Sequence, residues 1–242
     1  MNILAMDTCF GACSVAVGPA AQGSAQAFQS AFEVRQTGHA EVLMPMIDVV
    51  MSRAGLAFAD LQRIAVTTGP GSFTGMRIGI AAARAIGLTL SIPVIGIPTL
   101  DVMAHDVWTS STDQTASGSP TIGPLLIAVD ARKNQVYTQL YDANRASVSQ
   151  PAVLTYFEAA KLAGEQSVTI CGNGASLVAA ERNRLGLPTA VKFDDLQPSA
   201  VPLAMIAAAI DATALAQYPA RPFYLRPPDA KPQDGKTLVR AL

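Results

Sequence analysis

The sequence is poor in the side chains that hold metal ions or form disulfides. Its 242 residues include only three cysteines, Cys9, Cys13 and Cys171, and two histidines, His39 and His105. No CxxC, HExxH or close histidine pair occurs, so the spacing of a zinc site is missing. An odd number of thiols without disulfide spacing is typical of a reducing compartment. We therefore predict a cytoplasmic protein with buried thiols and no metal site.

Charge is also scarce. Charged residues make up 14% of the chain, the formal net charge is -1, and Lys and Arg form no dense run. A protein that binds nucleic acid by itself needs a concentrated basic face to neutralise phosphates. The sequence therefore predicts that a partner, and not this chain alone, would hold any RNA.

No long uninterrupted hydrophobic run is present, although half of the residues are hydrophobic. The stretch 78–100 contains Arg84 and two prolines, and 201–216 contains Asp211, which disfavours a membrane span in both. Asp7 interrupts the N-terminal apolar run too early for a signal peptide. Both stretches are expected to form core elements, without a membrane association.

The chain contains a short internal repeat. Residues 3–6 predict a strand that ends in Asp7 and returns along 13–17, and residues 125–130 and 135–141 repeat this pattern. The Ser- and Thr-rich segment before residue 125 is the candidate linker.

Two similar α/β domains are the economical interpretation. We predict a first domain at 1–108, a linker at 109–124, a second domain at 125–218 and a Pro-rich, extended tail at 219–242, with helix 200–216 a candidate to dock back on the first domain. The remaining elements expected are strands at 25–35, 64–67, 94–97, 168–171 and 190–193 and helices at 39–54, 74–90, 156–163, 175–185 and 200–216.

The segment 68–75, Thr-Gly-Pro-Gly-Ser-Phe-Thr-Gly, is the most distinctive. Glycines beside a helix start allow close backbone approach and leave N–H groups that suit an anion, but a Walker lysine is missing. The alternative is a tight turn in which a hydroxyl caps the helix. Asp7 and Thr8 have the same ambiguity between a phosphate or magnesium site and a turn. The candidate remnant of a nucleotide loop consists of Asp7, Thr8, Gly69, Gly71 and Ser72.

No catalytic residue is predicted. Ser72 is not in a GxSxG turn, and the cysteines have no adjacent base. Gly172-Asn173-Gly174 after a strand resembles a dinucleotide fingerprint, but Leu177 replaces its third glycine, so an oxidoreductase is the weakest alternative.

Small residues recur every four positions along the helix predicted after the loop: Gly75, Gly79, Ala83 and Gly87. Such positions share one helix face. The spacing is equally compatible with a docking face for a partner and with close packing on the parent sheet.

The segment 68–79, Thr-Gly-Pro-Gly-Ser-Phe-Thr-Gly-Met-Arg-Ile-Gly, resembles the signature of the TsaB (YeaZ) family. The opening hairpin, the helix from His39, Asp130-Ala131-Arg132 and Tyr224-Leu225-Arg226 resemble other parts of that family, so the similarity extends over most of the chain. It implies an α/β fold of the actin/sugar-kinase/Hsp70-like (ASKHA) class, with two similar domains, each a central mixed sheet with flanking helices.

The resemblance also implies a non-catalytic scaffold or activator subunit that works beside TsaD and the ATPase TsaE. Their reaction is the threonylcarbamoylation of adenosine 37 in ANN-decoding tRNAs. TsaD carries a metal-binding HxxxH pair, whereas the matching stretch 98–105 here holds only His105. Alternatives are a small-molecule kinase of the same fold and an M22-like peptidase.

The family further implies a TsaD heterodimer, a competing homodimer, tRNA contact only through the complex, and no tightly bound cofactor, with ATP or ADP at most weak or shared at an interface. The predicted partner and dimer interface lies on the two N-terminal helices and consists of Val42, Met46, Val49, Gly75, Gly79, Ala83 and Gly87.

Overall fold

A computed structural model describes residues 1–19, 25–112 and 122–226. The first domain is built on a five-stranded mixed sheet in the order β3-β2-β1-β4-β5. Strand β1 pairs antiparallel with β2 and parallel with β4, so the predicted opening hairpin is confirmed. The strands are β1 (Asn2–Asp7), β2 (Ala12–Pro19), β3 (Gln29–Val34), β4 (Leu61–Thr67) and β5 (Val94–Ile97); short 3-10 turns lie at Ala25–Ala27 and Phe58–Asp60.

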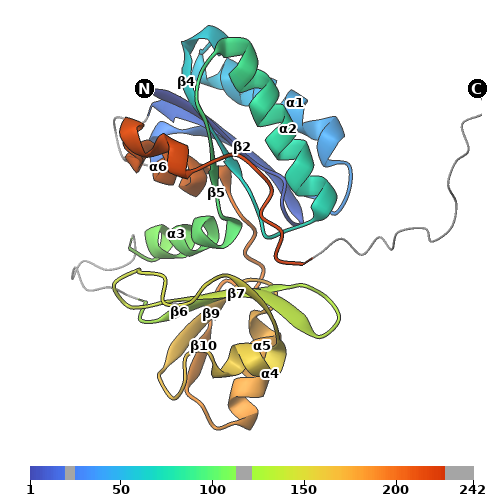
Figure 1. The fold of residues 1–242 in the computed structure, drawn as a ribbon, viewed down its shortest axis with the longest axis vertical. Helices are drawn as coiled ribbons and strands as arrows, with labels where there is room; N and C mark the ends of the chain where they lie inside the picture. The colour runs from blue at the N-terminus through green and yellow to red at the C-terminus, as the bar shows by residue number, and fades with distance from the viewer. Residues whose placement is uncertain (20–24, 113–121, 227–242) are drawn as a thin grey trace, which may run out of the picture.

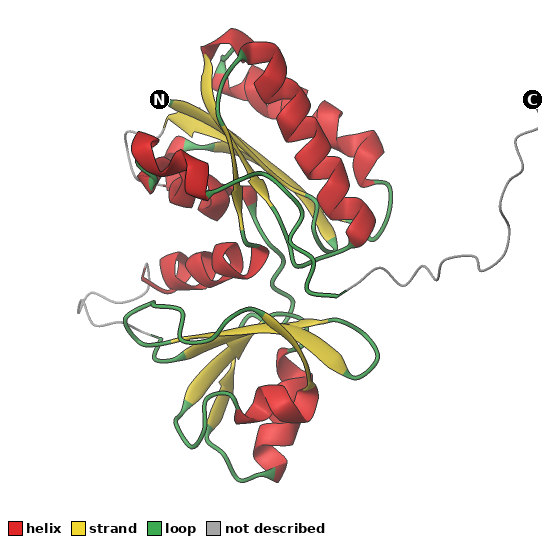
Figure 2. Ribbon diagram, viewed as in Figure 1, coloured by secondary structure: helices red, strands yellow, loops and turns green. Residues whose placement is uncertain are grey.

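The second domain repeats this sheet. Its strands are β6 (Leu125–Asp130), β7 (Gln135–Tyr141), β8 (Ala152–Thr155), β9 (Val168–Cys171) and β10 (Thr189–Val191). The order β10-β9-β6-β7-β8 is that of the first sheet, read from its other edge, when each strand is counted within its own domain. β6 pairs antiparallel with β7 and parallel with β9. The predicted ASKHA class, with two similar domains, is confirmed (Figure 2).

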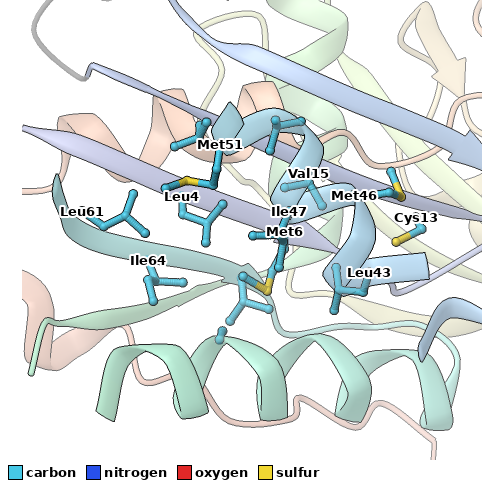
Figure 3. Close-up of a cluster of buried hydrophobic side chains, with 14 of the residues drawn as sticks. Leu4, Met6, Cys13, Val15, Leu43, Met46, Ile47, Met51, Leu61 and Ile64 are labelled. Atoms are coloured by element: carbon cyan, nitrogen blue, oxygen red, sulfur yellow. The ribbon is translucent and has the colours of Figure 1, made fainter. Parts of the chain in front are cut away.

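Helices α1 (His39–Ala54) and α2 (Phe73–Leu90) cover one face of the first sheet. Apolar residues of α1 that recur at helical spacing, such as Leu43 and Ile47, are buried against the sheet, in the cluster that includes Met6 (Figure 3). The helix begins at His39, so Pro45 lies inside it, on its exposed side.

Two helices separate the sheets (Figure 1). Helix α6 (Ala200–Ala209) packs on the other face of the first sheet, where Leu203 contacts the cluster around Ile3 and Ile95. Helix α3 (Thr99–Thr112) packs on the second sheet through residues such as Met103. The molecule is therefore layered, with α6 and α3 between the two sheets.

These helices change two sequence-based boundaries. Helix α3 continues to Thr112, four residues into the predicted linker at 109–124, and residues 113–121 of that linker lie outside the described part. Helix α6 lies in the segment 200–216 that the sequence made a candidate to dock on the first domain, and it packs on the first sheet although it follows the second in the chain. The helix expected at 200–216 ends at Ala209, and Asp211 caps a separate 3-10 turn at Ala212–Gln217 by accepting from the Thr213 N–H.

The second sheet is covered by α4 (Tyr156–Lys161) and α5 (Ala175–Arg184). Arg182 of α5 is fully buried, and its guanidinium donates to the carbonyls of Ala160, Gly164, Gln166 and Pro188 and to the Thr189 hydroxyl. It thereby joins α4, α5 and the start of β10. Within the described ranges, no helix is both long and apolar enough to cross a membrane.

Candidate functional site

The glycine-rich loop joins β4 to α2 and packs on the β1–β2 hairpin. A Cβ at Gly71 would overlap the Cys9 carbonyl oxygen, and one at Gly75 would overlap that of Thr8. Gly69 has a φ of 111°, a backbone conformation that favours glycine. The glycines are therefore required by this backbone conformation and by close approach of the chain to itself.

Several N–H groups of this loop have acceptors within the chain. Gly69 donates to the Thr99 hydroxyl at 3.1 Å, Ser72 donates to the Cys9 carbonyl at 2.6 Å, and Gly75 donates to the Ser72 hydroxyl at 3.3 Å. Ser72 is thus the N-cap of α2, as in the alternative that the sequence left open. An anion would have to compete with these internal acceptors.

Asp7 and Thr8 lie beneath this loop and are buried. The Thr8 hydroxyl donates to the Gly75 carbonyl at 2.7 Å and accepts from the Gly79 N–H at 3.1 Å. Asp7 accepts from the Thr67 hydroxyl at 2.5 Å and from the Cys9 N–H at 3.3 Å, which is the turn role considered above. The structure brings both residues close to the loop, but neither side chain is exposed to a ligand.

Burial dominates the electrostatics of Asp7. Desolvation raises its pKa from 3.8 to about 7, although hydrogen bonds from Thr67 and Cys9 oppose the rise. One carboxylate oxygen, Oδ2, has no hydrogen-bond partner. A buried carboxyl without a compensating cation favours the protonated form, so Asp7 is a neutral group over much of the acidic range.

A cleft of about 520 Å³ opens between the domains beside the loop. Of the five residues predicted as a nucleotide-loop remnant, Gly71 and Ser72 line it, whereas Asp7, Thr8 and Gly69 do not. Sequence reasoning missed several polar residues of its lining: Gln36, Asn173, Gln197 and Arg226. They come from four distant segments, and no local pattern links them.

The β6–β7 hairpin forms the second wall of the cleft. Asp130 Oδ1 accepts from the Arg132 N–H at 2.9 Å, and the Asn173 side chain accepts from the Asp130 N–H at 2.8 Å. A Cβ at Gly172 would overlap the Ala128 carbonyl oxygen, and one at Gly174 would overlap the Val136 side chain. The glycines that resembled a dinucleotide fingerprint are therefore explained by packing on β6 and β7.

The small-residue face of α2 points inward, which contradicts its predicted role as an interface. A Cβ at Gly79 would lie 2.6 Å from the Thr8 hydroxyl, and one at Gly87 would overlap the Val94 side chain. Gly75 and Ala83 are buried as well. The expectation that these four residues form a docking face is wrong, because the small side chains allow α2 to approach its own sheet.

The α1 part of the predicted interface is divided. Met46 is buried in the core and Val42 is half-buried against it, whereas Val49 is exposed. The surface that α1 and α2 do present, here called the α1–α2 face, is made of Glu41, Met44, Asp48 and Val49 from α1 and of Arg77, Ala81, Arg84, Ala85 and Leu88 from α2.

The histidines and cysteines of the described part do not assemble into a site. No group of three or more His, Cys, Asp or Glu side chains in the described ranges could hold a metal ion. His39 is buried, and its Nε2 lies 3.1 Å from the Phe10 carbonyl oxygen. Burial raises the pKa of the Cys13 and Cys171 thiols to about 12 and that of Cys9 further, which disfavours the reactive thiolate.

A family model and individual relatives of known sequence match this chain. The model of the TsaD family, tRNA N6-adenosine threonylcarbamoyltransferase, matches residues 33–223. The chain is 34% identical over 148 residues to the Escherichia coli tRNA threonylcarbamoyladenosine biosynthesis protein TsaB, covering 61% of this chain and 58% of that protein. It is 34% identical to an uncharacterized protein of Mycobacterium tuberculosis, covering 80% and 78% of the two chains. The alignment with the E. coli and Buchnera TsaB proteins thus spans about three fifths of their length.

Two solved structures agree with this result. YeaZ from Pseudomonas aeruginosa superposes with a TM-score of 0.73 at 26% identity, covering 93% of this chain and 99% of that one. An uncharacterized protein described as similar to peptidase YeaZ from Pseudomonas aeruginosa gives a TM-score of 0.72 at 28% identity over the same shares. The chain therefore belongs to the TsaB/YeaZ family, within the wider group that the TsaD family model defines.

Proposed function

We propose that this protein is an accessory subunit in the biosynthesis of tRNA threonylcarbamoyladenosine and that it acts by binding a TsaD-like paralogue. Its membership of the TsaB/YeaZ family supports the pathway. The observation that carries the proposal has two parts: several hydrogen-bonding groups of the glycine-rich loop already have partners within the chain, and two adjacent helices present an exposed apolar face.

The loop and thiols argue against chemistry by this chain alone. The Ser72 hydroxyl caps α2, and the loop N–H groups of Gly69, Ser72 and Gly75 have acceptors within the chain. A peptidase nucleophile or a phosphate cradle would need these groups free. The kinase and M22-like peptidase alternatives are weakened by this occupancy.

The α1–α2 face has the chemistry of a docking surface. Leu88 is 83% exposed, and Met44 and Val49 are 43% and 44% exposed, so three apolar side chains of these two helices face solvent. Acidic Glu41 and Asp48 lie on α1 and basic Arg77 and Arg84 lie on α2. On this face the charged residues are therefore acidic on α1 and basic on α2, although α1 also carries Arg53 in its last turn. The face suits a partner that presents a pair of helices.

The same charge pattern is self-complementary. In a two-fold dimer, α1 of one copy would face α2 of the other, so that acidic residues meet basic ones. A homodimer would therefore compete with the TsaD-like partner for one face. A TsaE-like ATPase, tRNA and any weakly held ATP or ADP would then join through the assembled complex in the cytoplasm.

The test is co-purification with the TsaD-like paralogue from the same organism. Leu88→Glu should abolish capture, because it places a charge on the most exposed apolar side chain of the face, which a partner would bury. Leu177→Glu is the matched control, since Leu177 is also an exposed leucine on a helix but lies in the second domain. Unchanged capture by folded Leu88→Glu would refute the docking face, and capture lost equally in both variants would refute its location.

A further inference from the structure

The C-terminal segment 218–226, here called the strap, continues the first sheet without being a regular strand. The Tyr218 carbonyl accepts from the Gly96 N–H at 2.9 Å, and Pro219 forms an isolated antiparallel bridge with Ile95 on the edge strand β5. Further on, the Phe223 N–H donates to the Thr68 carbonyl at 2.8 Å. The strap is therefore tied to the backbone of the first domain at both its start and its middle.

Two glycines make room for it. A Cβ at Gly96 would lie 2.7 Å from the Pro219 carbonyl oxygen, and a Cβ at Gly69 would lie 2.7 Å from that of Phe223. Real Cβ atoms essentially never approach backbone oxygens this closely, so a side chain at either position would displace the strap. These glycines allow the strap to lie directly against β5 and the glycine-rich loop.

Side chains hold the strap to the first turn of α2. Arg77 Nε donates to the Tyr224 hydroxyl at 2.8 Å, and the guanidinium carbon of Arg77 lies 3.8 Å from the centre of the Phe73 ring. The Phe73 and Tyr224 rings stack with centroids 5.3 Å apart. A cation over an aromatic face is attracted to it, so three side chains act as one contact.

The last described residue of the strap reaches the other domain. Arg226 donates to the Ala131 carbonyl at 2.9 Å and also to the Gln135 side-chain oxygen. Both acceptors belong to the β6–β7 hairpin, whose residues 132–134 have positive φ angles between 55° and 61°. This turn is in an unusual conformation for non-glycine residues, and Arg226 contacts it on both sides.

We propose that the strap is a latch that sets the angle between the two domains and hence the width of the cleft. It lines the cleft with Phe223, Tyr224, Leu225 and Arg226, and it is bonded to β5, the loop and α2 on one side and to the β6–β7 hairpin on the other. Opening the cleft at this end would break the contacts of Arg226, which add to the contact between the Phe10 and Tyr137 rings on the same two walls. The latch shares Arg77 with the α1–α2 face, whereas its contacts with the second domain are made by Arg226.

The test measures the distance between the domains in the full chain. Spin labels are attached at Ala59→Cys in the first domain and Asn183→Cys in the second, both exposed positions away from the strap. The native thiols of Cys9, Cys13 and Cys171 are buried and should not react with the label. Double electron–electron resonance on this protein should give one narrow distance distribution.

Arg226→Ala should at least double the width of that distribution. Arg221→Ala is the matched control, because it removes an exposed arginine from the same strap and should leave the width unchanged. If Arg226→Ala fails to fold by circular dichroism, Gln135→Ala removes only one acceptor and should broaden the distribution in the same direction. A folded Arg226→Ala or Gln135→Ala protein with the parent distribution would overturn the latch.

Discussion

The buried carboxyl of Asp7 makes folding stability depend on pH in an unusual direction. Desolvation raises its pKa from 3.8 to about 7 in the folded protein. Between these values the folded state keeps a proton that the unfolded chain releases, so the unfolding free energy falls as pH rises from about 4 to 7. The difference between the two pKa values corresponds to about 4 kcal/mol of unfolding free energy. The folded protein has this contribution below about pH 4 and has lost it above about pH 7.

Replacement by asparagine should remove this dependence. In the Asp7→Asn variant, the amide oxygen can still accept from Thr67 and the Cys9 N–H, while the amide NH2 group takes the place of Oδ2, which has no partner. The substitution should therefore stabilise the protein above pH 7 by up to about 4 kcal/mol, less the cost of an unpaired amide donor of about 1 to 3 kcal/mol.

Urea unfolding of the parent and of Asp7→Asn at half-unit steps from pH 4.5 to 8 measures this effect. The difference between the two unfolding free energies should grow with pH in favour of the variant. Asp211→Asn is a control, because hydrogen bonds from Thr213 lower the pKa of the exposed Asp211; its carboxylate is therefore charged in both the folded and the unfolded chain over this pH range, and the difference from the parent should stay nearly constant. Parallel curves for parent and Asp7→Asn would refute the assignment of a proton to this buried group.

Two further substitutions test the packing directly by urea unfolding. Gly79→Val should lower the unfolding free energy by about 2 to 3 kcal/mol, because its Cβ would overlap the Thr8 hydroxyl. Ala85→Val, on the exposed side of the same helix, should lower it by less than about 1 kcal/mol. Equal losses would contradict the inward direction of the small-residue face of α2. Arg182→Met should lower the unfolding free energy by about 3 to 5 kcal/mol, because it leaves buried carbonyls without hydrogen-bond donors. Arg184→Met, at an exposed position, should change it by less than about 0.5 kcal/mol. A small effect at Arg182 would mean that those carbonyls find other donors.

Local patterns in the sequence predicted the framework of the fold. Alternating apolar residues located both hairpins, and helical spacing located α1 with its bounds at His39 and Ala54. These patterns work because side chains alternate across a strand and repeat every three to four residues along a helix. The break between α6 and the 3-10 turn was missed, since Ala-rich sequence continues through Ile210 and Asp211 is equally at home in an exposed helix.

The direction in which a periodic face points was not predictable from its spacing. The small residues of α2 define one face, but only the position of β1 and β4 decides whether that face meets a partner or the parent sheet. The strap was missed for a related reason. An extended segment that bonds to two domains through its backbone and one arginine has no periodicity, so it appeared only as a Pro-rich tail.

The role of the glycine-rich loop was not predictable from local sequence for the same reason. Glycines next to a helix start fit an anion site and a self-packed turn equally well, because both require the backbone to approach something closely. The two are distinguished by what the backbone approaches, and here it is Thr8, Cys9 and Phe223 of the same chain. A substitution that frees the loop from these contacts would also loosen the β1–β2 hairpin and the strap. The loop, the hairpin and the latch are therefore one packing unit, and the exposed side of α2 is what this unit leaves available for a partner.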